Sequence, residues 1–255
     1  MRIVVVGGSG LIGSRLMTNL RELGQDAVNA SLDTGVNLLT GEGVADTMSG
    51  ADVVVDVSNS PSLEGPAALE FFTTATNNLL AAESEAGVGH HVALSVVGTD
   101  RLTASGYMRA KIVQETMIKD SSIPYSILHA TQFFEFIMGI AKDGTDGNTV
   151  RMAPVLVQPV AADDVASALG QIAVGAPHNG TVELGGPEQF RLDELVRDSL
   201  RARNDPREVV PDVHAPYFGA ELSQRSLVPE KDALLGSIRY EEWLNAALAD
   251  SDHQT

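Results

Sequence analysis

The stretch Ile3-Val4-Val5-Val6-Gly7-Gly8-Ser9-Gly10-Leu11-Ile12-Gly13 decides the fold. Its apolar, β-branched first part is typical of a buried parallel strand. The glycines that follow allow a sharp turn and let a ligand approach the backbone with no Cβ in the way. Leucine and isoleucine then recur at helical spacing from Leu11 to Leu23, which predicts a helix that begins inside the glycine run. Its first N–H groups and its positive dipole end suit a diphosphate.

Two glycine registers fit this stretch. Gly8, Gly10 and Gly13 match G-x-G-x-x-G, and Gly7 with the latter two also matches G-x-x-G-x-x-G. A strand before the motif and a helix after it are the context of a dinucleotide fingerprint, whereas the alternative is a turn that binds nothing. The predicted cofactor contacts of the loop are Gly7, Gly10, Leu11, Ile12 and Gly13.

Length, charge and composition exclude several classes of protein. The 255 residues can bury the core of one α/β domain, and the absence of cysteine excludes disulfides, thiolate nucleophiles and cysteine-bound metals. A net charge of −17 disfavours nucleic acid and anionic membranes as partners. No apolar run approaches the about 20 residues of a membrane span, and no signal-peptide pattern is present. We expect a cytoplasmic protein without a metal site.

Strand and helix patterns alternate through residues 1–150, which predicts a Rossmann core with a doubly wound parallel sheet. The pattern loosens afterwards. We expect residues 151–255 partly to return to the core and partly to form a small C-terminal substrate-binding region. Asp163 and Asp164 are the expected N-cap of a helix over 165–174. Recurring prolines predict loop and turns over 205–229.

Tyr107 and Lys111 lie four residues apart on a predicted helix and therefore share one face. An ammonium close to the phenol would lower the pKa of Tyr107, so that it could exchange a proton with a carbonyl or an alcohol. Ser95 ends a predicted strand, and a hydroxyl there can donate to the same carbonyl oxygen. The competing interpretation is an ordinary amphipathic helix with a loop hydroxyl nearby.

Further motifs follow in order, among them Asn78-Leu79-Leu80, Ser95-Val96-Val97-Gly98, Ala130-Thr131-Gln132-Phe133 and Gly185-Gly186-Pro187. Together with the glycine loop and the Tyr107–Lys111 pair, they make the chain resemble an atypical short-chain dehydrogenase/reductase of the NmrA-like NAD(P)-binding group. The resemblance implies a Rossmann core with a small C-terminal substrate region. It also implies cofactor contacts from Ser58, Asn59 and Lys111.

The choice between NAD(H) and NADP(H) depends on the end of the second strand, where an Asp or Glu usually binds the ribose diol. In the register of the family this position falls at Ser31, which is neutral and does not repel a 2′-phosphate. Arg15 is the nearby cation for a phosphate, whereas Asp33 could serve a diol if the loop bends back. We predict a preference for NADP(H).

Substrate contacts are predicted on the carboxyl side of the strand that ends near Leu128. His129 stands where relatives often have Arg, and Gln132 and Phe133 can line a pocket for a flat or apolar molecule. The sequence thus predicts an NAD(P)H-dependent oxidoreductase that reduces a carbonyl or quinone-type small molecule, with Tyr107 as proton donor.

Two alternatives stay open. The first is an NADP(H)-binding redox sensor without turnover, since the family contains such members and a fold alone does not decide function. The second is a sugar-nucleotide epimerase or dehydratase, for which 255 residues are short. The oligomeric state is also open, with a homodimer as one alternative.

Overall fold

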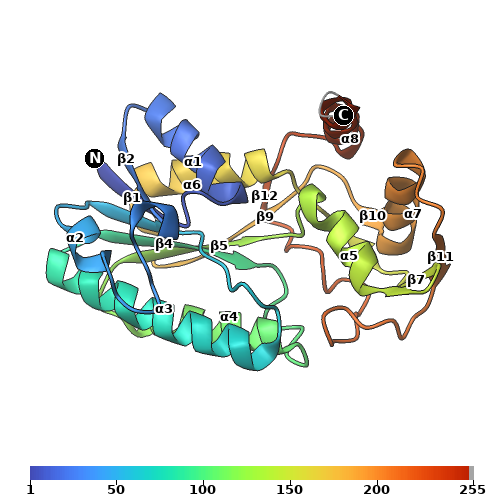
Figure 1. The fold of residues 1–255 in the computed structure, drawn as a ribbon, viewed down its shortest axis with the longest axis horizontal. Coiled ribbons are helices and arrows are strands. Elements are labelled where there is room, and N and C mark those ends of the chain that lie inside the picture. Colours follow the sequence, from blue (N-terminus) through green and yellow to red (C-terminus); the bar gives the residue numbers. More distant parts are fainter. Residues whose placement is uncertain (253–255) are drawn as a thin grey trace.

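The protein is described here by a computed structural model, which covers residues 1–252. At the centre of this part of the chain lies a parallel sheet of seven strands in the order β12-β9-β5-β4-β3-β1-β2 (Figure 1). The strands are β1 (Arg2–Val6), β2 (Asp26–Ala30), β3 (Val53–Asp56), β4 (His90–Val96), β5 (Tyr125–Ala130), β9 (Gly180–Gly185) and β12 (Leu234–Leu235). The strand order reverses between β1 and β3. Such a switch point is where open α/β sheets bind their ligands.

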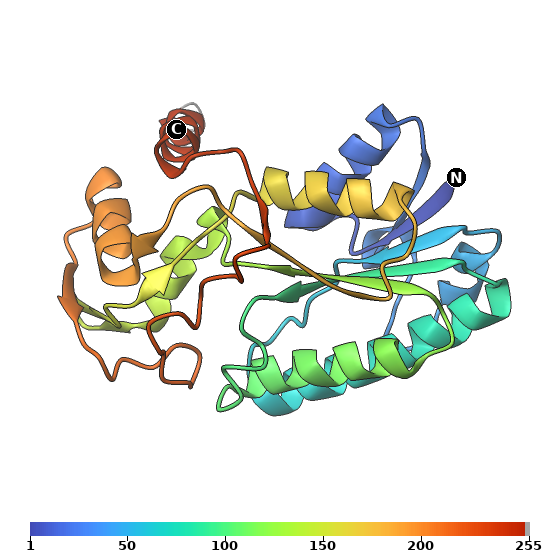
Figure 2. The same cartoon turned by 180° about the vertical axis from the view of Figure 1, so that it is seen from behind.

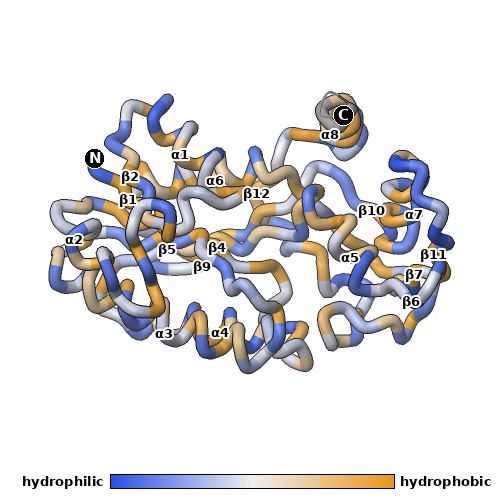
Figure 3. Tube along the Cα trace, viewed as in Figure 1, coloured by the Kyte–Doolittle hydropathy of each residue, from blue (hydrophilic) through white to orange (hydrophobic). Residues whose placement is uncertain are grey.

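Helices cover both faces of the sheet (Figures 1 and 2). One face carries α1 (Leu11–Glu22) and α6 (Ala162–Val174), and the other carries α2 (Val44–Met48), α3 (Gly65–Ala86) and α4 (Gly106–Asp120). Along β1, Ile3 and Val5 pack into a cluster with α1 and α6, whereas Val4 and Val6 pack with α2 and α3. Figure 3 shows these hydrophobic stretches along the central strands. The predicted doubly wound Rossmann sheet is confirmed.

A smaller lobe lies beyond the end of the sheet (Figure 2). Its helices are α5 (Ile137–Asp143), α7 (Leu192–Ala202) and α8 (Tyr240–Asp252), and its strands are β6 (Thr145–Asp146), β7 (Thr149–Met152), β8 (Leu156–Val157), β10 (Phe190–Arg191) and β11 (Glu208–Pro211). A single apolar cluster that includes Phe134, Met152 and Leu195 fills this lobe. The chain returns to the main sheet through α6, β9 and β12.

Two expectations about this half of the chain need correction. The N-cap of α6 is Ala161, not an aspartate, and Asp164 instead accepts hydrogen bonds from the backbone N–H groups of Ser237 and Ile238, each over 3.0 Å. The segment 205–229 is not loop throughout, because β11 pairs in parallel with β7. In residues 1–252, no helix is both long enough and apolar enough to cross a membrane.

Candidate active site

The glycine loop lies at the switch point, in contact with the segment after β3. Gly7 has a φ of +80°, and a Cβ on it would lie 3.1 Å from the backbone nitrogen of Ser58. The structure therefore brings Ser58, and with it Asn59, next to the loop, as the resemblance implies. Within the described residues the Ser58 hydroxyl is buried without a hydrogen-bond partner. A buried, unpaired hydroxyl at a ligand-binding edge points to a partner outside the chain.

The loop has the shape that a diphosphate requires. A Cβ on Gly13 would lie 2.1 Å from the Gly7 carbonyl oxygen, so only glycine allows this approach of helix to loop. Gly10 is the N-cap of α1 and makes no side-chain cap, which leaves the first-turn N–H groups of Leu11 and Ile12 facing the loop. These groups and the helix dipole form a site for an anion, and the residues present therefore fit a dinucleotide.

Ser31 and Arg15, the two residues predicted to bind the adenosine ribose or its phosphate, are directed to different places. The hydroxyls of Ser31 and Ser9 lie 3.0 Å apart, and Asn29 Nδ2 donates to Ser9 Oγ over 2.9 Å. Ser31 is thus next to the glycine loop. Arg15 is directed elsewhere, because its Nε donates to Asp163 Oδ1 at the start of α6 over 3.1 Å. The Arg15 guanidinium would have to leave this ion pair to reach a 2′-phosphate.

Tyr107 lies in the first turn of α4 and faces the segment after β3. Its hydroxyl donates to Asn59 Oδ1 over 2.9 Å, and its ring packs edge-on against Phe72, with centroids 5.9 Å apart. Burial raises the pKa of Tyr107 to about 12. The phenol is therefore protonated at neutral pH, but its pKa is shifted in the direction opposite to the one expected from a neighbouring ammonium, because burial dominates.

Lys111 is buried one turn further along α4. Its Nζ donates to the Leu94 carbonyl over 2.9 Å and to Gln114 Oε1, and it lies 4.5 Å from the centre of the Phe72 ring. Gln114 Nε2 in turn donates to Asp56 Oδ2 over 2.9 Å. Burial lowers the pKa of Lys111 to about 8. These contacts turn the ammonium into the interior, and no hydrogen bond joins it to Tyr107 within residues 1–252.

Ser95 and His129 meet at a residue that the sequence did not single out. Ser95 Oγ donates to Glu115 Oε1 over 2.6 Å, and His129 Nε2 lies 2.8 Å from the same oxygen. Lys119 Nζ donates to the other carboxylate oxygen over 3.0 Å. Burial alone would raise the pKa of Glu115, but the hydrogen bonds from His129, Ser95 and Lys119 outweigh it and lower this pKa to about 2. His129 also borders an open groove of about 510 Å³.

Gln132 and Phe133 lie beyond the end of β5. Phe133 stacks on Phe136, with ring centroids 5.3 Å apart. The Gln132 side chain is buried, and within the described chain neither its oxygen nor its nitrogen has a partner at hydrogen-bond distance. Tyr217 approaches this amide: burial raises the pKa of Tyr217 well above its usual range, and Gln132 and Tyr107 both act on it. The Tyr107 hydroxyl, the Tyr217 hydroxyl and the Gln132 amide therefore lie near one another.

The segment that carries Tyr217 is fixed to the loop after β4. Gly98 has a φ of +86°, and a Cβ on it would lie 2.4 Å from the Ser226 carbonyl oxygen. Arg101 Nη1 donates to the carbonyl oxygens of Arg225, over 3.1 Å, and of Val228, over 2.9 Å. The Ser95-Val96-Val97-Gly98 motif thus leads directly into the contacts that hold residues 225–228.

The sequence analysis missed Glu115, Gln114 and Tyr217. Glu115 continues the spacing of four residues from Tyr107 through Lys111, so its position on the same helix face was a usable signal. Tyr217 stands in a segment with no periodic pattern, and only the folded chain brings it close to Gln132.

The likeness to known proteins is one of structure. No protein-family model matches the chain, and no curated protein matches its sequence. Among solved structures, MoeE5 in complex with UDP-glucose and NAD is similar with a TM-score of 0.76 at 18% identity, over 100% of this chain and 99% of that one. The chain shares the Rossmann fold of this structure.

Two further structures have the same fold. A short-chain dehydrogenase/reductase superfamily protein from Agrobacterium tumefaciens with bound NAD aligns with a TM-score of 0.73 at 16% identity, over 99% of this chain and 97% of that one. An NADPH-dependent quinone oxidoreductase from Escherichia coli aligns with a TM-score of 0.65 at 15% identity, over 96% and 99%. Identities this low establish the fold alone, and the NmrA-like branch remains a prediction.

Proposed function

We propose that this protein is an NAD(P)H-dependent oxidoreductase that reduces a carbonyl or quinone-type small molecule. The observation that carries the proposal is the Tyr107 hydroxyl, which is protonated at neutral pH and held by Asn59 next to the glycine loop. Two of the similar structures contain bound NAD, and a third is an NADPH-dependent quinone oxidoreductase. The glycine loop of this chain supplies the matching diphosphate cradle.

A reduced nicotinamide cofactor, when bound, supplies the hydride. The diphosphate would be held by the N–H groups of Leu11 and Ile12, with Ser58 and Asn59 alongside. Tyr107 would give its hydroxyl proton to the oxygen of the acceptor and regain one from solvent. The acceptor thus gains one hydride, which carries both electrons, and one proton. Asn59 orients the phenol for this transfer. Lys111, in its buried position, fixes the middle of α4 against β4 through the Leu94 carbonyl.

We further propose that NADP(H) is preferred. Within residues 1–252 the hydroxyls of Ser9 and Ser31 accept or donate no hydrogen bond with a carboxylate, so nothing in the pair repels a 2′-phosphate. Dissociation constants for NADPH and NADH test this directly, and tighter binding of NADH would contradict it.

A redox sensor without turnover is the second candidate function. It is favoured by one observation: Ser95 and Lys111 hydrogen-bond inside the protein, to Glu115 and to the Leu94 carbonyl, rather than toward a substrate. The sugar-nucleotide alternative also stays, because the chain spans 99% of the structure solved with UDP-glucose, so its length is no objection.

The deciding experiment follows NADPH absorbance with purified protein and a panel of quinones, ketones, aldehydes and nucleotide sugars. We expect consumption with a carbonyl or quinone that falls in Tyr107→Phe. Consumption that is unchanged in Tyr107→Phe would contradict the role of the phenol, and NADPH binding without any consumption would favour the sensor.

A further inference from the structure

The amide of Gln132 is an anomaly among the buried polar side chains of this protein. It is only 7% exposed, yet neither Oε1 nor Nε2 has a hydrogen-bond partner among the described residues. A buried amide without partners is destabilising, because its polar atoms lose their bonds to water and gain none in return. Gln158 offers a direct comparison, because it is equally buried but fully bonded: its Nε2 donates to the Gly186 carbonyl and its Oε1 accepts from Gln189, each over 2.8 Å.

The backbone around Gln132 is well fixed. Its backbone is held in register, because Val160 N donates to the Gln132 carbonyl over 2.9 Å and the next residue but one, Phe134, donates back to Val160 over 3.0 Å. The side chain is therefore aimed by a fixed backbone toward Tyr217. The Gln132 side chain acts on the Tyr217 hydroxyl as a weak hydrogen-bond partner that lowers its pKa, although neither amide atom has a partner of normal hydrogen-bond geometry, and Tyr107 packs against the apolar cluster that contains Tyr217.

We propose that Gln132 and Tyr217 form the substrate-recognition subsite next to Tyr107, and that this subsite binds a neutral group with both a hydrogen-bond donor and an acceptor. An amide can satisfy such a group at Oε1 and Nε2 at once. This inference rests on the proposed function, in which Tyr107 is the proton donor.

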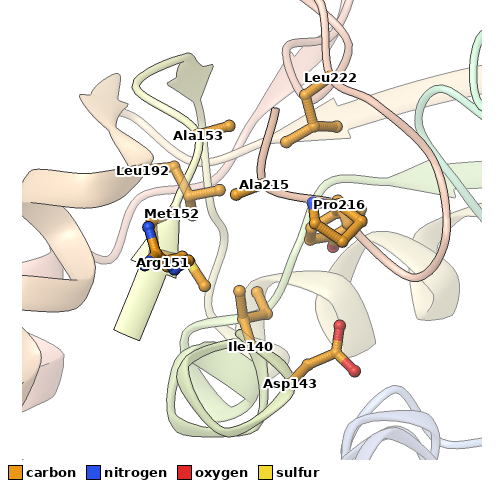
Figure 4. Close-up of a pocket in the computed structure, with 10 residues that line it drawn as sticks. Ile140, Asp143, Arg151, Met152, Ala153, Leu192, Ala215, Pro216 and Leu222 are labelled. Carbon is orange, nitrogen blue, oxygen red and sulfur yellow. The ribbon is translucent and has the colours of Figure 1, made fainter. Parts of the chain in front are cut away.

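The charge around the subsite argues for a neutral ligand. Asp143 is the charged group that acts on Tyr217, and its negative charge disfavours an anion there. Beside Tyr217 the structure has a cavity of about 10 Å³, whose lining includes the apolar Ile140 and Leu222 and the charged Asp143 and Arg151 (Figure 4). This space is about that of one water molecule. The Arg151 guanidinium lies 3.7 Å from the carboxylate of Asp212, which compensates its charge, so a buried anion would have to compete with Asp212 for this cation.

Three aryl ketones of similar size separate the chemical classes. Benzoylformamide carries a neutral amide, benzoylformate a carboxylate and propiophenone an ethyl group beside the same carbonyl. Their dissociation constants are measured by calorimetry on the full chain, with and without saturating NADP⁺. Binding of NADPH is measured separately by fluorescence, so that a failure of the proposed cofactor is not mistaken for a failure of the subsite.

We expect the wild-type protein to bind benzoylformamide about tenfold more tightly than the other two ketones, as expected for one extra hydrogen-bonded pair. In Gln132→Leu this preference should vanish while the melting temperature stays the same or rises, because an unpaired polar group is removed. Gln158→Leu is the matched control, and it should lower the melting temperature but keep the preference.

Four outcomes would overturn the proposal. These are equal binding of all three ketones to the wild-type protein, no binding of any, a preference that survives in Gln132→Leu, and a loss of stability in Gln132→Leu as large as in Gln158→Leu. If the amide preference depends on Gln132 but NADPH does not bind, the subsite is supported and the oxidoreductase is not.

Discussion

The Tyr107 hydroxyl and Asn59 Oδ1 lie 2.9 Å apart, and this hydrogen bond joins the start of α4 to the segment that follows β3. The same oxygen accepts the backbone N–H of Ser60 over 2.9 Å, so the acceptor itself is fixed. The proton donor is thus oriented by the strand next to the switch point. Of the two elements that hold it, the segment after β3 also borders the glycine loop.

Removing this acceptor should therefore slow the reaction without unfolding the protein. In Asn59→Ala we expect kcat to fall about tenfold, a part of the about 10²–10⁴-fold that a positioned acid contributes. The measurement is NADPH consumption with the best acceptor of the panel. Asn78→Ala is the control, because Asn78 Nδ2 donates to the Leu38 carbonyl over 2.7 Å at another place. An equal loss of kcat in both variants would count against the orienting role.

Gly13→Ala should abolish cofactor binding. Its Cβ would meet the Gly7 carbonyl oxygen at 2.1 Å and the Gly8 Cα at 2.6 Å, so the loop must change its shape. Fluorescence titration with NADPH is expected to give at least a hundredfold weaker binding, about 2.8 kcal/mol. Gly170→Ala in α6 is the control, because its nearest neighbour would be a Leu16 methyl at 3.7 Å. That variant should bind normally, since alanine suits a helix; normal binding by Gly13→Ala would refute the cradle.

Acid stability should depend on Glu115. Its pKa of about 2 lies below the usual 4.5, so its contribution is complete above pH 5 and is lost as the pH falls toward 2. We expect Glu115→Gln to be less stable than wild type at pH 7, by about 3 kcal/mol at most, and the gap in free energy of unfolding to narrow steadily as the pH falls from 5 toward 2. Urea unfolding at several pH values measures it. Exposed Glu85, changed to Gln, should give no such gap, and a gap for Glu115 that is independent of pH would contradict the assignment.

The Arg15–Asp163 ion pair allows a test of the cofactor preference. If Arg15 binds the 2′-phosphate, it must first leave Asp163, with which it pairs over 3.1 Å. Asp163→Asn should then tighten NADPH binding by a few-fold, because exposed ion pairs are worth roughly 0–1 kcal/mol, and should leave NADH binding unchanged. Arg15→Ala should weaken NADPH alone. Parallel effects on both cofactors would show that Arg15 does not distinguish them.

The fold was predictable because its signals are local. Four β-branched or apolar residues before a glycine run specify a buried strand and the turn after it, whatever the rest of the chain does. The pairing of Tyr107 with Asn59 was less accessible, since it joins residues 48 positions apart. Ser95 and Lys111 were identified from their spacing. Their hydrogen-bond partners, Glu115 and Gln114, were not, because burial and charge act on these side chains only in the folded core.

The C-terminal half was harder for a related reason. Residues 205–229 carry no hydrophobic period, and β11 exists because β7 is available to pair with it. Asp163 and Asp164 look like a cap in the sequence, but each finds a partner far along the chain, Arg15 and Ser237. Local propensity gave way to tertiary contacts in both cases.

The close contact between Ser226 and Gly98 holds together the loop after β4 and the segment around Ser226, which are distant in the sequence. The loop that leaves β4 continues into α4, where Tyr107 stands, and the same loop holds the segment that carries Tyr217. Any molecule that enters by displacing Tyr217 must therefore pull on the backbone that leads to the proton donor. The entry of such a molecule and the alignment of Tyr107 are therefore linked through Gly98, where the methyl group of an alanine would not fit.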